Sequence, residues 1–182
     1  MCIPGAPETL FCSALPLNLM PNNNVKGTRF KCVWSSVRRK GISIEVSLFA
    51  HATEDPQKVE SAFRNILPSS RRDEVTLRKR VLKGEYGNPI VYYKAKITKM
   101  EIAEAILRKM ACNLSTLDKE MLEGDLERRV EKGSLYIRLD KQAAYLGKFR
   151  LCNSDPIHLK VRFKTPKINS IRSICRDLGM LP

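Results

Sequence analysis

Residues 157–164 read IHLKVRFK, and this stretch decides the fold of the chain. Its apolar residues alternate strictly with its basic ones: Ile157, Leu159, Val161 and Phe163 against His158, Lys160, Arg162 and Lys164. Such alternation is typical of a strand that buries one side and exposes the other. Strands of an all-parallel sheet are buried on both sides and read as continuous apolar runs, so the pattern favours an antiparallel or mixed sheet.

Four more stretches extend this sheet. Residues 42–48 and 135–139 show the same alternation, and residues 75–83 and 90–97 form two strands joined by the turn-rich sequence GEYGNP at 84–89. The sequence therefore predicts several strands that each bury one side.

Helices are expected between these strands. Asp55-Pro56 is a typical helix start, and Thr98 with Glu101 predicts a capping box for the next helix. Another helix should begin at Ser115, with an apolar stripe formed by Leu117, Met121, Leu126 and Val130. Asp140 is expected to cap a short segment that ends at Gly147, and Thr165-Pro166 opens a last helix. The fold class is therefore α+β, a two-layer sandwich with helices mainly on one face of the sheet.

Charge points to a polyanionic partner. The 182 residues contain 33 Lys and Arg against 19 Asp and Glu, a formal net charge of +14. The excess lies mainly before residue 100 and in the last 35 residues, while the middle is nearly neutral. Such asymmetry favours nucleic acid over an evenly solvated surface or an anionic membrane. The sequence lacks an apolar run of 18 residues, so no membrane partner is expected.

Domain organisation follows from composition. Residues 1–35 hold four prolines and three consecutive asparagines with little periodicity, so we expect a poorly ordered extension followed by one α+β domain over residues 36–182. The cysteines at 2, 12, 32, 112, 152 and 175 form no C-x-x-C pair, which disfavours a zinc site. We expect free, mostly buried thiols, a cytoplasmic location and no cofactor.

A basic face is the candidate binding site. If the apolar sides of the strands pack on helices, cations and aromatics gather on the other side, where RNA phosphates and unstacked bases would meet them. In the hairpin the strand phase is open, so Lys79 and Lys83 are the alternative to Arg78 and Arg80. A basic face that is merely solvated is the competing interpretation. The candidate RNA contacts are Arg38, Arg39, Lys40, Arg78, Arg80, Lys94, Lys96, Tyr136, Arg138, Lys160, Arg162 and Lys164.

Catalytic patterns are scarce. The sequence has no P-loop, dinucleotide-binding fingerprint, H-E-x-x-H or G-x-S-x-G motif. His51 lacks an evident partner, and we expect a structural histidine there. The sequence therefore predicts a non-enzymatic protein without a metal site.

Residues 136–147, YIRLDKQAAYLG, resemble a motif of an archaeal protein family described as RNA-binding and as a predicted exosome subunit. SIEVSLFAHA at 43–52 and Asp155-Pro156 are similar to that family too, and the match covers roughly residues 37–165 in the same order. The resemblance implies a fold like that of ribosomal RNA-binding proteins, with no cofactor.

The resemblance also directs attention to the turn after the strand at 135–139, where Lys141 and Gln142 would meet phosphate or a base edge. The expected function is RNA binding, accessory to exosome-like RNA processing or degradation. The alternative is a structural subunit that forms a homodimer or a larger assembly through its sheet face or edge, without RNA contact.

Overall fold

The structure, a computed structural model, describes residues 41–85 and 87–182. The expected N-terminal extension and the basic run Arg38–Lys40 lie outside the described residues. The domain boundary near residue 36 therefore stays a prediction.

Six strands form one antiparallel sheet in the order β2-β3-β1-β6-β5-β4. Their bounds are β1 (Ile42–Ala50), β2 (Arg78–Lys83), β3 (Pro89–Ile97), β4 (Val130–Glu131), β5 (Ser134–Asp140) and β6 (Pro156–Phe163). The IHLKVRF stretch is β6, which pairs with β1 on one side and β5 on the other. The predicted α+β class is confirmed, and the sheet is antiparallel.

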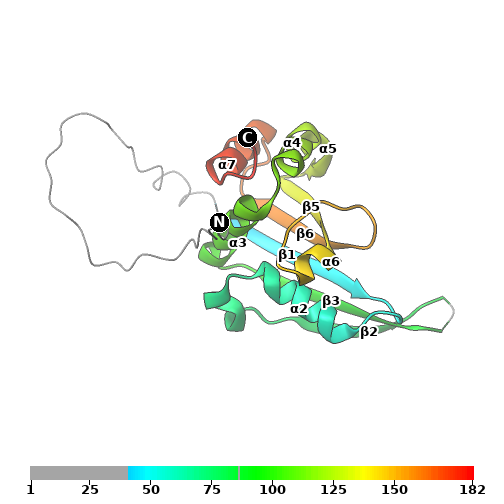
Figure 1. Cartoon of the computed structure of the whole chain (residues 1–182). Helices are drawn as coiled ribbons and strands as arrows, with labels where there is room; N and C mark the ends of the chain where they lie inside the picture. The colour runs from blue at the N-terminus through cyan, green and yellow to red at the C-terminus, as the bar shows by residue number, and fades with distance from the viewer. Residues whose placement is uncertain (1–40, 86) are drawn as a thin grey trace, which may run out of the picture. The chain divides into compact units, whose positions relative to one another are not determined.

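Helices lie between groups of strands along the chain, and the last helix follows the last strand (Figure 1). They are α2 (Pro56–Ile66), the 3-10 helix η1 (Ser69–Glu74), α3 (Met100–Asn113), α4 (Thr116–Gly124), α5 (Leu126–Arg129), α6 (Lys141–Tyr145) and α7 (Ile168–Asp177). No helix in residues 41–85 and 87–182 has the length and apolarity that crossing a bilayer requires.

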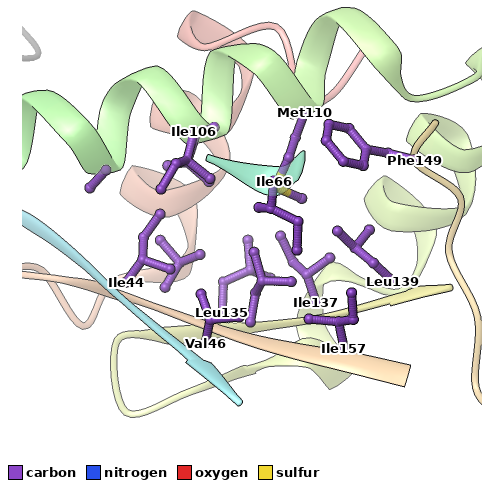
Figure 2. Close-up of a cluster of buried hydrophobic side chains, with 14 of the residues drawn as sticks. Ile44, Val46, Ile66, Ile106, Met110, Leu135, Ile137, Leu139, Phe149 and Ile157 are labelled. Atoms are coloured by element: carbon purple, nitrogen blue, oxygen red, sulfur yellow. The ribbon is translucent and has the colours of Figure 1, made fainter. Parts of the chain in front are cut away.

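The core lies between the sheet and the helices. Figure 2 shows Ile44 and Val46 of β1 and Ile137 of β5 beneath Ile106 and Met110 of α3. Each of these side chains is at most 1% exposed. The buried residues of β1 alternate along the whole strand, as the sequence predicts, so the sheet has one apolar side and one polar side.

Two of the three predicted helix caps are confirmed. The Asp55 carboxylate accepts a hydrogen bond from the Gln57 N–H at 2.8 Å, with Pro56 at the first helical position. The Asp140 carboxylate caps α6. The capping box at Thr98 is wrong: α3 begins after Lys99, and the Lys99 side chain makes no capping hydrogen bond.

The predicted apolar stripe of the helix after Ser115 is right for Leu126, which is fully buried on α5, and wrong for Leu117 and Met121. Val130 lies in the strand β4 rather than in a helix. Leu117 and Met121 are 66% and 48% exposed, whereas Asp118 and Leu122 are buried. The buried Asp118 carboxylate accepts hydrogen bonds from the Ser115 hydroxyl and from the Leu151 N–H. A carboxylate whose oxygens are satisfied in this way can face inward, and the helix turns its apolar pair outward instead.

Three of the six cysteines lie in the described residues, and all three are free thiols. Cys175 is buried, and burial raises the pKa of its thiol to about 12. Cys112 is exposed and Cys152 is half-buried. The expectation of mostly buried thiols is therefore wrong for two of these three.

Candidate nucleic-acid interface

The side of the sheet opposite the core carries alternate residues of five strands, and we call it the polar face. Its basic and aromatic members are half-buried or exposed: Arg78 and Arg80 on β2, Tyr92, Lys94 and Lys96 on β3, Tyr136 and Arg138 on β5, and His158, Lys160 and Arg162 on β6. The strand register therefore places eight of the predicted RNA contacts on one side of one sheet.

The pairing of β2 with β3 shows which residues of this hairpin belong to the polar face. Arg78 lies opposite Lys94 and Arg80 opposite Tyr92, so both arginines belong to the polar face. Lys79 lies opposite Tyr93, the core residue whose ring is 6.0 Å from the Lys79 ammonium. Lys79, and by alternation Lys83, therefore belong to the other side.

Two cross-strand rows run across the polar face. One row joins neighbouring partners in the order Arg78, Lys94, Ser47, His158 and Arg138. With strands about 4.8 Å apart, its ends are about 19 Å from each other. The other row joins Lys96, Glu45, Lys160 and Tyr136. The cations of these rows, with Ser47, His158 and Glu45 among them, form a band across the polar face.

Glu45 is the acid inside this band. Its carboxylate pairs with the Lys94 ammonium at 2.8 Å. The hydrogen bond from Lys94 lowers the pKa of Glu45, burial opposes that shift, and the charges of Arg162 and Lys160 add to it. Glu45 is therefore ionised at neutral pH. It forms an ion pair with Lys94, a cation that could otherwise contact a phosphate.

Aromatic rings lie among these charges. The Lys160 ammonium is 4.9 Å from the centroid of the Tyr136 ring, and that tyrosine is 37% exposed. Phe49 and Tyr92 pack against each other with centroids 4.9 Å apart and ring planes inclined by 35°. Cations beside aromatics are the combination that single-stranded nucleic acid needs.

The half of the polar face beside α5 and β4 contains a groove of about 690 Å³. Its floor comes from β1, β5 and β6, and its wall comes from α5 and β4. Arg128 and Arg129 on α5 contribute to this wall, as does Asn153 from the loop before β6. The sequence did not predict these two arginines as RNA contacts, because nothing local shows that α5 lies beside the sheet.

His158 lies in this groove. Burial lowers its pKa, the Arg138 charge lowers it further, and Asp155 opposes both effects. At neutral pH the imidazole is therefore uncharged and offers one hydrogen-bond donor and one acceptor.

Lys141 does not match the expectation of a cation presented to RNA. It is 7% exposed, and its ammonium pairs with Glu54 at 2.8 Å and Asp155 at 2.5 Å. The same ammonium donates to the Phe49 carbonyl at 2.8 Å. Because Lys141 is buried and has three oxygen partners, its side chain links α6 to β1 and to the loop before β6.

The remaining predicted contacts are scattered. Gln142 is exposed on α6, which packs against α2 away from the polar face, as Figure 1 shows. Lys164 is exposed just beyond the end of β6, with its side chain beside Gly41. Arg38, Arg39 and Lys40 lie outside the described residues.

One cluster of metal-ligand types was missed by sequence reasoning. His51, Glu54 and Asp155 bring one potential ligand atom each within 4.8 Å of the others. The His51 Nε2 lies 3.3 Å from the Asp155 carboxylate, a partner 104 residues away. The Lys141 ammonium pairs with both carboxylates, so a positive charge already occupies the position that a metal ion would take.

Comparisons with known proteins agree with this architecture. The model of a family described as RNA binding matches residues 43–163. The RNA-binding protein PAB1135 of Pyrococcus abyssi is 34% identical over 125 residues, which are 67% of this chain and 81% of that protein. Protein AF2318 of Archaeoglobus fulgidus, of family DUF54, has a crystal structure with a TM-score of 0.63 and 32% identity, covering 75% of this chain and 97% of its own.

A second structure, Mth689 of Methanothermobacter thermautotrophicus, is also a DUF54 protein. It has a TM-score of 0.59 and 28% identity, and it covers 73% of this chain and 96% of its own. Because the family model spans more than half of the chain, the chain belongs to the family that this model describes as RNA binding.

Proposed function

We propose that this protein binds RNA through the polar face of its sheet, without catalysing a reaction. The observation that carries the proposal is the band of cations and aromatics that five antiparallel strands bring to one side. Family membership and the name of the Pyrococcus relative, an RNA-binding protein, support the same ligand class.

Several cations of the band are available to a ligand. Among the described residues, no ion pair involves Arg78, Arg80, Lys96, Arg138, Lys160 or Arg162. Each cation that meets a phosphate releases a counterion, so binding should weaken steeply with salt. The accessory role in exosome-like RNA processing belongs to the proposal and rests on the family resemblance of residues 136–147. A cytoplasmic location also belongs to the proposal and rests on the cysteine pattern of the sequence, which favours free thiols.

The competing function is assembly without RNA. The edge strand β2 is exposed along its whole length, and Val81 on it is 68% exposed. Edges of this kind can pair with another chain. However, β2 has four cations among six residues, RKRVLK, so antiparallel pairing of two copies would set like charges against each other.

The test is binding of a fluorescently labelled RNA, measured by anisotropy over a range of salt concentrations. We expect the double variant Lys160→Glu/Arg162→Glu to bind at least about tenfold more weakly, because each change replaces an attractive charge by a repulsive one. The neutral pair Lys160→Gln/Arg162→Gln should lose less, in the same direction. Circular dichroism should show both variants folded, since exposed substitutions usually cost within about 0.5 kcal/mol.

The matched control is Lys58→Glu/Lys148→Glu. These lysines are exposed and lie off the polar face, and the change in charge is the same. The control should bind like the parent protein. A parent protein that retains no RNA at low salt would overturn the proposal. So would normal binding by a folded Lys160→Glu/Arg162→Glu variant, and light scattering would then test the assembly function.

A further inference from the structure

The groove on the polar face differs chemically from the rest of the cationic band. Four of its lining side chains are basic and three are acidic. The basic ones are Arg128, Arg129, Arg138 and Lys160, and the acidic ones are Glu45, Asp125 and Glu131. Cations and carboxylates nearly balance inside the groove, so its interior attracts a phosphate group less than the purely basic β2–β3 part of the polar face does.

The groove is held in place by packing. Leu126 of α5 is fully buried, and β4 pairs with β5 through Val130 and Leu135. Asp125 interrupts the helix between α4 and α5, and its carboxylate pairs with Arg129 at 3.1 Å. These contacts set the wall of the groove beside the floor formed by β5 and β6 before any ligand arrives.

The interior offers both hydrogen-bond donors and acceptors. Ser47, His158 and Asn153 are uncharged polar groups, and each can donate and accept. Arg138 adds donors and Glu131 adds acceptors. The edges of nucleobases carry donors and acceptors side by side, so a mixed lining suits a base better than it suits a phosphate.

Tyr136 supplies the remaining element. It lines the groove with 37% of its surface exposed. The Lys160 ammonium lies over one face of its ring, 4.9 Å from the centroid, so a base would stack on the opposite face or displace this ammonium. A base needs an aromatic face on which to stack. The groove volume of about 690 Å³ lies within the range of about 300–1,000 Å³ that small-molecule pockets occupy.

We propose that the groove receives an unstacked base of single-stranded RNA, which stacks on Tyr136 while the cations outside the groove hold the phosphates. This inference rests on the proposed RNA-binding function and deepens it. A base can enter only if it is free of its helix, so the protein selects single strands over duplex RNA at this site.

The experiment compares three RNA ligands of equal length: a single-stranded oligonucleotide, its abasic counterpart with the ribose-phosphate backbone intact, and a duplex. The parent protein should bind the single strand about tenfold more tightly than the abasic strand, the scale of one stacking contact. It should also prefer the single strand to the duplex.

Substitutions then connect the preference to the groove. Tyr136→Leu should bind the intact and abasic strands equally, with its affinity for the abasic strand unchanged. Tyr136→Phe should keep the preference because the ring remains. The control Tyr145→Leu removes a tyrosine that is 43% exposed on α6, away from the polar face, and should behave like the parent.

The outcomes separate the two proposals. If the parent binds none of the three RNAs, the proposed function fails and this inference fails with it. If the parent binds intact, abasic and duplex RNA equally, RNA binding stands and the base site is wrong. If Tyr136→Leu, shown folded by circular dichroism, retains the preference for the intact strand, the base is bound elsewhere and the inference is overturned.

Discussion

The two halves of the polar face follow the same alternation rule and yet differ in charge. The β2–β3 half presents Arg78, Arg80 and Lys96, and the acid nearest to it, Glu45, is neutralised by Lys94. The groove half mixes carboxylates, amide, hydroxyl and imidazole with its cations. The first half is suited to phosphates in general and the second to a base. A count of positive charges along the sequence does not separate these roles.

The largest effect on RNA affinity is expected from neutralising the β2–β3 half. The triple variant Arg78→Gln/Arg80→Gln/Lys96→Gln removes three cations that form no ion pair in the described residues. The log–log salt slope should become shallower by about 2, at about 0.7 for each lost phosphate contact.

The same triple variant should lose equal affinity for intact and abasic strands, since all three side chains would meet phosphates only. Anisotropy titrations over a series of salt concentrations measure both quantities. An unchanged salt slope, or a loss of affinity confined to the intact strand, would mean that the β2–β3 half does not bind phosphates as proposed.

A smaller effect of opposite sign is expected at the boundary between the halves. Glu45→Gln removes a carboxylate that is ionised at neutral pH, because Lys94 lowers its pKa, and it frees that ammonium. RNA affinity should rise by up to about fivefold, since two unit charges about 4 Å apart in water interact by about 1 kcal/mol. The gain should be the same on intact and abasic strands.

The cost of Glu45→Gln in folding should be slight, because partly exposed ion pairs contribute roughly 0–1 kcal/mol. Thermal unfolding followed by circular dichroism would register it. A drop in RNA affinity in the folded variant would instead assign Glu45 a direct contact with the ligand.

No effect on RNA affinity is expected from Lys141, which lies outside both halves. Lys141→Met leaves the Glu54 and Asp155 carboxylates without their shared ammonium. These carboxylates are 27% and 43% exposed, so water can solvate them and the loss should be smaller than the about 3–5 kcal/mol typical of a fully buried pair. The melting temperature should fall, while binding measured well below that temperature stays normal. The exposed Lys148→Met serves as the control and should change neither property. Weaker RNA binding by the folded Lys141 variant would indicate that this lysine contributes to RNA binding after all.

Lys141 and Asp118 show where prediction from the sequence stops. Lys141 follows a strand whose phase is read correctly, and it looks like a surface cation. Its partner Glu54 is 87 residues away in the chain, so no local sequence pattern predicts this ion pair. The predicted stripe likewise did not include Asp118, because the hydrogen bond that its carboxylate accepts from the Leu151 N–H spans 33 residues.

The predicted helix caps also show which interactions can be read from the local sequence. Asp55 and Asp140 act through backbone N–H groups two or three residues away, and both are confirmed. Thr98 is not the cap of α3, although the helix is present and buries Ile102, Ile106 and Met110. Helix α3 is stabilised by that buried stripe, so its start does not depend on a side-chain cap.

The sequence by itself determined the strands at 42–48, 135–139 and 157–164, their buried sides and hence the existence of a polar face, because a period of two residues is a local property of an extended backbone. It left open which residues of the β2–β3 hairpin face the core, and it placed Val130 of β4 in a helix. It also determined that the face is basic, since the charged side chains sit at the alternate positions of those strands. The tertiary structure alone decided which strands are neighbours, and so that Lys160 meets Tyr136 and that Arg128 stands beside Arg138 in one groove. Such contacts depend on sheet order and on the burial of Leu126, which are long-range consequences of core packing that no short window of sequence contains.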